Sequence, residues 1–142
     1  MKKLLLMGMV LVGALATDGF AKSRAPHDVA RELVKAADVV AATYRRSGMT
    51  GLIVGRQTCY EKAKESPFYC IYLDLASRFI DQTFVAAMHY PPTEFFADEP
   101  SEVRIGATLR RARIGGKEAD EYLKMLVPAI DQLVAEKLLR KQ

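Results

Sequence analysis

Along most of the chain after residue 25, apolar residues recur at intervals of three and four positions, which is the spacing of one α-helical face. In the first such segment the apolar positions are Val29, Leu33, Ala37, Val40 and Tyr44. Two arginines and Gly48 follow them, a combination typical of a helix C-terminus. We therefore predict a first helix over Pro26–Arg46 that stops at Gly48.

The next segment, Met49 to Ser66, has a less regular pattern. Two glycines weaken a helix here, and Leu52-Ile53-Val54 would suit a short strand. A single strand without a partner is unstable, however. We therefore expect a second helix that ends near Glu65, with Ser66 as the N-cap of the helix after it.

The third segment, from Pro67 to about His89, is apolar around most of its circumference, so it should form the central, most buried helix. Its polar positions form one narrow stripe: Asp74, Ser77, Arg78, Asp81 and Gln82. Asp74 and Arg78 have the spacing of an i,i+4 ion pair. Tyr90-Pro91-Pro92 should end this helix, because two successive prolines cannot continue it.

Two further helices are predicted over Ser101–Arg113 and Lys117–Lys141, on either side of Gly115-Gly116. Pro128 interrupts the last one, and we expect a kink or a break between Lys124 and Pro128. The pattern thus predicts an all-α, single-domain bundle of about five helices over residues 22–142.

The N-terminus has a different composition. Lys2 and Lys3 precede an apolar run of about 13 residues, which is shorter than the roughly 20 that cross a bilayer. Small residues then offer cleavage after Ala16 or after Ala21, and neither site is followed by a cysteine. We predict a cleaved signal peptide over residues 1–21 and a free protein in the periplasm or outside the cell. The alternative is an uncleaved N-terminal anchor.

The two cysteines, Cys59 and Cys70, both follow the predicted signal peptide. In an oxidising compartment such a pair usually forms a disulfide. Cys59 precedes and Cys70 follows the predicted turn at Ser66-Pro67, so they can face each other across a helical hairpin. A redox-active pair is the alternative, although catalytic dithiols are usually only two residues apart.

Charge and composition exclude some classes of function. The formal net charge is +4, and it falls to +2 without Lys2 and Lys3, or to +3 if Asp18 is removed as well. This near-balance, without interleaved basic and aromatic residues, argues against a nucleic-acid partner.

Residues for catalysis, metals or cofactors are scarce. His27 and His89 are the only histidines, and neither shows the spacing of a metal site or a nucleophilic triad. A hydrolase with paired carboxylates drawn from Glu94, Asp98, Glu99, Asp74 and Asp81 is the enzymatic alternative. We expect a protein that is not an enzyme and carries no cofactor or metal.

Two segments are candidate contact surfaces for a protein partner. Between His89 and Pro100, aromatic and acidic residues are combined as in interface hot spots: Tyr90, Glu94, Phe95, Phe96, Asp98 and Glu99. In the alternative interpretation, Phe95 and Phe96 close the core. A second, basic patch contains Arg104, Arg110, Arg111 and Arg113, which could instead complement the dipole of the fourth helix.

A signal peptide, a small helical domain, one disulfide and no catalytic motif together resemble the periplasmic immunity proteins of type VI secretion peptidoglycan amidases. The resemblance implies an inhibitor that binds a cell-wall amidase and obstructs its active-site groove, often with a projecting loop. An envelope chaperone or stress protein and an accessory subunit of a secretion or conjugation system are the alternatives. The sequence leaves the oligomeric state open.

Overall fold

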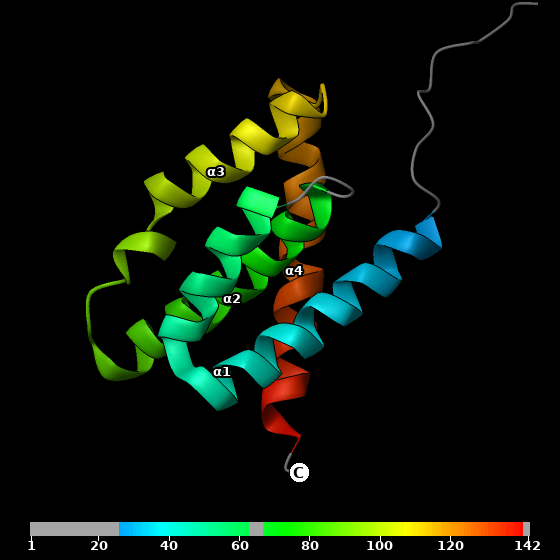
Figure 1. Ribbon diagram of the computed structural model, residues 1–142. Helices are drawn as coiled ribbons and strands as arrows, with labels where there is room; N and C mark the ends of the chain where they lie inside the picture. Colours follow the sequence, from blue (N-terminus) through cyan, green and yellow to red (C-terminus); the bar gives the residue numbers. More distant parts are fainter. Residues whose placement is uncertain (1–25, 63–66, 141–142) are drawn as a thin grey trace, which may run out of the picture.

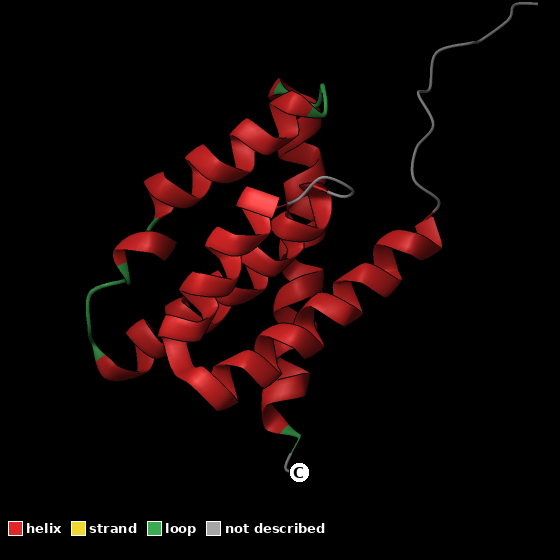
Figure 2. Cartoon of the chain, in the orientation of Figure 1, coloured by secondary structure: helices red, strands yellow, loops and turns green. Residues whose placement is uncertain are grey.

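The computed structural model describes residues 26–62 and 67–140, and in these ranges the chain is helical without any strand. The elements are α1 (Pro26–Lys62), α2 (Pro67–Met88), the short 3-10 helix η1 (Glu94–Phe96), α3 (Asp98–Arg111) and α4 (Gly116–Leu139) (Figures 1 and 2). The predicted all-α class is confirmed. The strand considered for residues 52–54 is wrong, because these residues lie within α1. The predicted signal peptide lies outside the described residues.

α1 takes the place of two predicted helices. Gly48 has a non-helical backbone, with φ 58° and ψ −156°, and helical residues continue on both sides of it. The glycine therefore kinks the helix, as Figure 1 shows, without adding a loop. The described ranges consequently contain four α-helices where about five were predicted.

Replacing Gly48 with alanine should lower the free energy of unfolding by about 1–3 kcal/mol, because a positive φ with ψ near 180° is a conformation essentially restricted to glycine. Contact with other parts of the protein is not the cause, since beyond the local backbone nothing lies within 4 Å of a Cβ at this position. Gly55→Ala is the matched control: Gly55 is equally open but helical, so alanine there should be neutral or stabilising by up to about 1 kcal/mol. Urea denaturation compares the two, and equal midpoints would contradict a strained Gly48.

α2 is the central helix, as predicted, and it packs against α1, η1, α3 and α4. Every residue from Cys70 to Ser77 is buried. The helix ends one residue before the predicted position, where His89 has φ 57° and donates its backbone N–H to the Val85 carbonyl at 2.9 Å. Pro91 and Pro92 then prevent any further helical turn.

The last two helices differ from the prediction at their boundaries. α3 begins at Asp98, three residues early, because Pro100 lies in its first turn, where a missing N–H removes no helical hydrogen bond. α4 continues through Pro128, and the break considered there is not found. Pro128 is exposed, so water can hydrate the carbonyl that its missing N–H leaves unpaired.

The core lies where α1, α2 and α4 pack against one another, and η1 and α3 add Phe96, Ile105 and Leu109 to it. Of the helices described, none combines the length and the hydropathy needed to cross a membrane.

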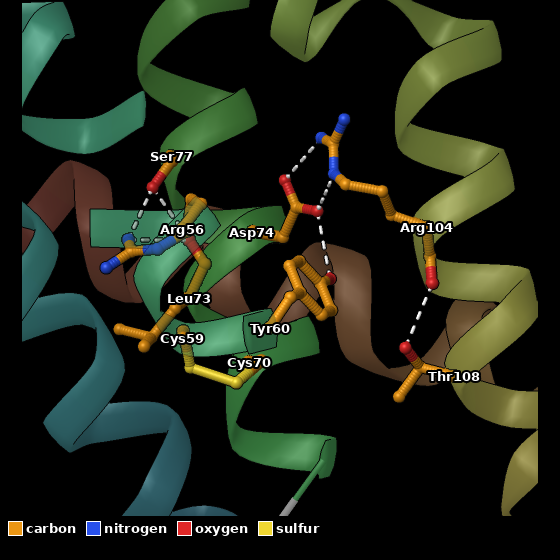
Figure 3. Close-up of a disulfide and its surroundings, with 9 residues drawn as sticks. All are labelled: Arg56, Cys59, Tyr60, Cys70, Leu73, Asp74, Ser77, Arg104 and Thr108. Carbon is orange, nitrogen blue, oxygen red and sulfur yellow. Dashed lines mark hydrogen bonds and ion pairs between the residues drawn. A yellow bond between two sulfur atoms is a disulfide. The ribbon is translucent and has the colours of Figure 1, made fainter. Parts of the chain in front are cut away.

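A disulfide joins Cys59, near the end of α1, to Cys70, in the first turn of α2, with their Cα atoms 5.7 Å apart. The predicted pairing is confirmed. Figure 3 shows the bond beside a group of polar side chains from α1, α2 and α3.

Candidate functional site

The polar stripe predicted on α2 is largely buried: Asp74, Ser77 and Asp81 are each at most 2% exposed. The predicted pair of Asp74 with Arg78 does not form. Asp74 instead pairs with Arg104 of α3, and Arg78 with Asp98 at the start of α3. The reason is that α3 packs on α2. This packing brings Arg104 closer to Asp74, and Asp98 closer to Arg78, than Asp74 and Arg78 are to each other.

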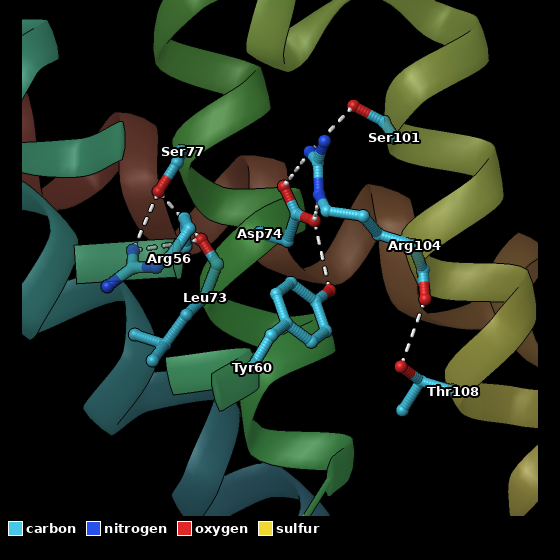
Figure 4. A network of polar contacts seen from close by, with 8 residues as sticks. All are labelled: Arg56, Tyr60, Leu73, Asp74, Ser77, Ser101, Arg104 and Thr108. Carbon is cyan, nitrogen blue, oxygen red and sulfur yellow. Dashed lines mark hydrogen bonds and ion pairs between the residues drawn. The ribbon is translucent and has the colours of Figure 1, made fainter. Parts of the chain in front are cut away.

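Asp74 accepts hydrogen bonds from two helices. Arg104 donates from Nε to Oδ2 at 3.0 Å and from Nη2 to Oδ1 at 3.1 Å, and the Tyr60 hydroxyl donates to Oδ2 at 2.9 Å (Figure 4). Burial and the neighbouring Asp74 carboxylate raise the pKa of Tyr60 above its usual range, so the hydroxyl remains a donor. These contacts satisfy a carboxylate that has no exposed surface.

Arg104 therefore does not belong to an exposed basic patch, and the prediction that grouped it with Arg110, Arg111 and Arg113 is wrong for this residue. Its guanidinium carbon lies 3.8 Å from the centre of the Phe95 ring, a cation–π contact. The other three arginines are exposed. They lie at the C-terminal end of α3, at the top of Figure 1.

Arg56 is a buried arginine that was not among the predicted site residues. It is 3% exposed and donates from Nη1 to the Leu73 carbonyl at 3.2 Å and to Ser77 Oγ at 2.8 Å. Burial lowers the pKa of Arg56, while Asp74 raises it. Figure 4 shows Arg56 and Arg104 on opposite sides of α2. Arg56 lies four residues after Leu52, on the face of α1 that meets α2, and this spacing could have indicated that Arg56 is buried.

The loop after α2 is fixed by Asp81. This carboxylate, 2% exposed, accepts hydrogen bonds from the Thr93 backbone N–H at 3.2 and 3.3 Å and from Thr93 Oγ1 at 2.5 Å. η1 begins at the next residue. The end of the loop is thus held against α2.

The side chains of Phe95 and Phe96 point in different directions. Phe96 is 1% exposed and belongs to the core, so it cannot contact a partner in this conformation. Phe95 is half-buried beneath Arg104 and meets the Phe96 ring edge-on at a centroid distance of 5.0 Å. The interpretation in which Phe96 closes the core is the correct one, because adjacent residues of a tight helical turn point to different sides.

An apolar cluster lies exposed at the end of α2. Its members are Phe84, Met88 and Tyr90, with 39%, 51% and 57% of their surface exposed, and we call them the tip surface. The rings of Phe84 and Tyr90 lie 6.0 Å apart. Of the residues predicted to contact a partner, the structure exposes Tyr90, Glu94, Asp98 and Glu99. Phe84 and Met88 were not among the predicted contact residues, although both are apolar and lie in the last turns of α2.

The segment that follows Arg78 and carries the tip surface has acidic residues but no lysine or arginine before Arg104. Glu94, Glu99 and Glu102 are exposed there, and the exposed Asp98 carboxylate pairs with Arg78. The segment that carries the tip surface is therefore acidic, while the other end of α3 is positive.

The carboxylates considered for hydrolysis lie in different environments. Asp74 and Asp81 are buried with separate partners, and Glu94, Asp98 and Glu99 are exposed on η1 and α3. Within residues 26–62 and 67–140 no group of His, Cys, Asp and Glu side chains could hold a metal ion. His89 is exposed at the end of α2, and the side chain of His27 lies outside the described residues.

A shallow apolar hollow on α4 is a further surface feature that the sequence analysis missed. It is lined by Asp120, Leu123, Lys124, Val127 and Pro128.

Comparison of the chain with protein-family models, with curated proteins and with solved structures finds no match.

Proposed function

We propose that this chain is an exported, non-enzymatic binding protein, an immunity-type inhibitor that binds and blocks a peptidoglycan-degrading amidase. The observation that carries the proposal is the tip surface, an exposed pair of aromatic rings and a methionine beside a loop whose end is fixed. Large, exposed aromatic side chains on an ordered support are typical anchors of a protein interface.

Order in the loop supports this interpretation. Thr93 is bound to Asp81, Phe95 is held under Arg104, and Phe96 is fixed in the core. The chain after Tyr90 therefore loses little conformational freedom when a partner binds. A lower entropic cost gives tighter binding for the same contact area.

The partner's contact face should be basic around an apolar hollow. Glu94, Glu99 and Glu102 are exposed on the segment that follows the tip surface, and the chain between Arg78 and Arg104 contains no lysine or arginine. Complementary charge of this kind mainly raises the association rate and selects among partners. Association should therefore slow as salt increases.

The test begins with the gene beside this one. If it encodes a small peptidoglycan hydrolase, that enzyme is purified and its release of peptides from isolated cell walls is measured with and without this protein. We expect inhibition to be complete near equimolar amounts. Unchanged hydrolysis in the presence of excess folded protein would contradict the proposal.

The alternatives predict other outcomes. An envelope chaperone would suppress the aggregation of several unrelated unfolded proteins, and the apolar hollow on α4 would be its candidate contact. An accessory subunit would be encoded within a secretion or conjugation operon and would leave the hydrolase fully active.

A further inference from the structure

η1 and α3 are attached to the rest of the molecule mainly through α2. α1, α2 and α4 each pack against the other two, whereas α3 packs chiefly on α2 and η1. Three core side chains come from this unit, Phe96, Ile105 and Leu109. The polar attachment is the Arg104–Asp74 ion pair, together with the exposed pair of Asp98 and Arg78. Units with few neighbours are the first to open in a folded protein.

The disulfide is connected to this attachment by adjacent contacts. Tyr60 directly follows Cys59, and Asp74 lies one helical turn after Cys70. The Tyr60 hydroxyl and Arg104 Nε both donate to the same oxygen of Asp74, at 2.9 and 3.0 Å. Figure 3 shows these residues from the sulfur atoms to α3, and Figure 4 shows the part from Tyr60 to Arg104.

Arg104 extends this series of contacts to η1, because its guanidinium lies over the ring of Phe95. The disulfide, Tyr60, Asp74, Arg104 and Phe95 thus form one contiguous series that ends in η1, which follows the Tyr90 loop in the chain. η1 and α3 are otherwise held by the Thr93–Asp81 hydrogen bonds, the Asp98–Arg78 pair and the three core side chains, all of which they share with α2 or the core.

We propose that the Cys59–Cys70 disulfide controls the order of η1 and α3 and thereby regulates the part of the tip surface that lies in the loop before η1, at Tyr90. Its consequence for binding rests on the proposed function, whereas the structural effect does not. When the bond is absent, the last turns of α1 separate from α2, Tyr60 leaves Asp74, and η1 and α3 open. α1 before its last turns, α2 and α4 remain packed.

The chemical step is thiol–disulfide exchange with a dithiol reductant. A thiolate of the reductant attacks Sγ of Cys59, which is less buried than Cys70, and Cys70 leaves as a thiolate and takes up a proton. The second thiolate of the reductant then displaces Cys59 and closes the reductant's own disulfide. Two electrons and two protons pass to the protein.

Hydrogen exchange measures the effect on the protein alone. We expect the amides of residues 94–111 to exchange at least about tenfold faster in Cys59→Ser/Cys70→Ser than in the oxidised protein. The amides of residues 126–134 in α4 should keep their protection within about threefold. Uniform loss of protection, or a change confined to residues 56–72, would overturn the proposal.

A variant that keeps the disulfide separates this coupling from general instability. Tyr60→Phe removes only the hydroxyl that meets Asp74, and it should also raise exchange in residues 94–111. Its matched control is Tyr72→Phe, which removes a hydroxyl bonded to Tyr122 at 2.7 Å between α2 and α4. Exchange in α3 that responds equally to both variants, or to neither, would contradict the coupling.

Because these experiments need no partner, they remain decisive if the protein does not inhibit a hydrolase. Conversely, a hydrolase that binds the Cys59→Ser/Cys70→Ser variant as tightly as the oxidised protein would contradict regulation of the tip surface by the disulfide and leave the proposed function intact.

Discussion

Replacing Asp74 with alanine should lower the free energy of unfolding by about 3–5 kcal/mol, the usual effect of removing one partner from a buried ion pair. Asp74 is fully buried, and its loss leaves the Arg104 guanidinium, the Tyr60 hydroxyl and the nearby Arg56 without the carboxylate that faces them. Urea denaturation of the oxidised protein measures the change.

Asp98→Ala is the matched control, because it removes another carboxylate that forms an ion pair between α2 and α3. The side chain of Asp98 is 81% exposed, and an exposed pair contributes only about 0–1 kcal/mol. A further variant, Asp74→Leu/Arg104→Leu, should recover much of the lost stability, since it removes both charges of the pair and leaves neither without its partner. If Asp74→Ala were no more destabilising than Asp98→Ala, the buried pair would not hold α3 on α2.

Replacing Phe96 with alanine should cost about 3–5 kcal/mol of folding stability, because the ring is 1% exposed and leaves a cavity in the core. Tyr90→Ala should instead change the free energy of unfolding by less than about 0.5 kcal/mol, because 57% of that side chain is exposed. Thermal unfolding distinguishes them. A Phe96→Ala protein as stable as Tyr90→Ala would mean that Phe96 is not a core residue.

Features set by local chemistry could be predicted from the sequence. Pro67 begins α2 and the prolines after Tyr90 follow its end, because proline restricts its own backbone and that of its neighbour. The disulfide followed from two cysteines on either side of one turn. Gly48 marked a real change of direction, but the pattern could not show that helix resumes at once.

Contacts between distant segments could not be predicted. The nearest opposite charge to Asp74 along the helix is Arg78, yet its partner is Arg104, thirty residues away, because α3 crosses α2 at that point. Phe95 and Phe96 are equivalent in the sequence, and only the direction of η1 decides which of them is buried. Of the tip surface, only Tyr90 was predicted from the sequence. Phe84 and Met88 were not, because their pattern resembles that of core positions.

The central claim is that the tip surface binds the partner, and the dissociation constant of the complex with the neighbouring hydrolase tests it most directly. Phe84→Ala/Tyr90→Ala should weaken binding by about 2–4 kcal/mol, or roughly 30- to 1000-fold, while the protein stays folded. Met125→Ala, which removes a similarly exposed side chain on α4, should leave the affinity unchanged. Equal affinity of the two variants, or a loss confined to Met125→Ala, would place the binding surface elsewhere.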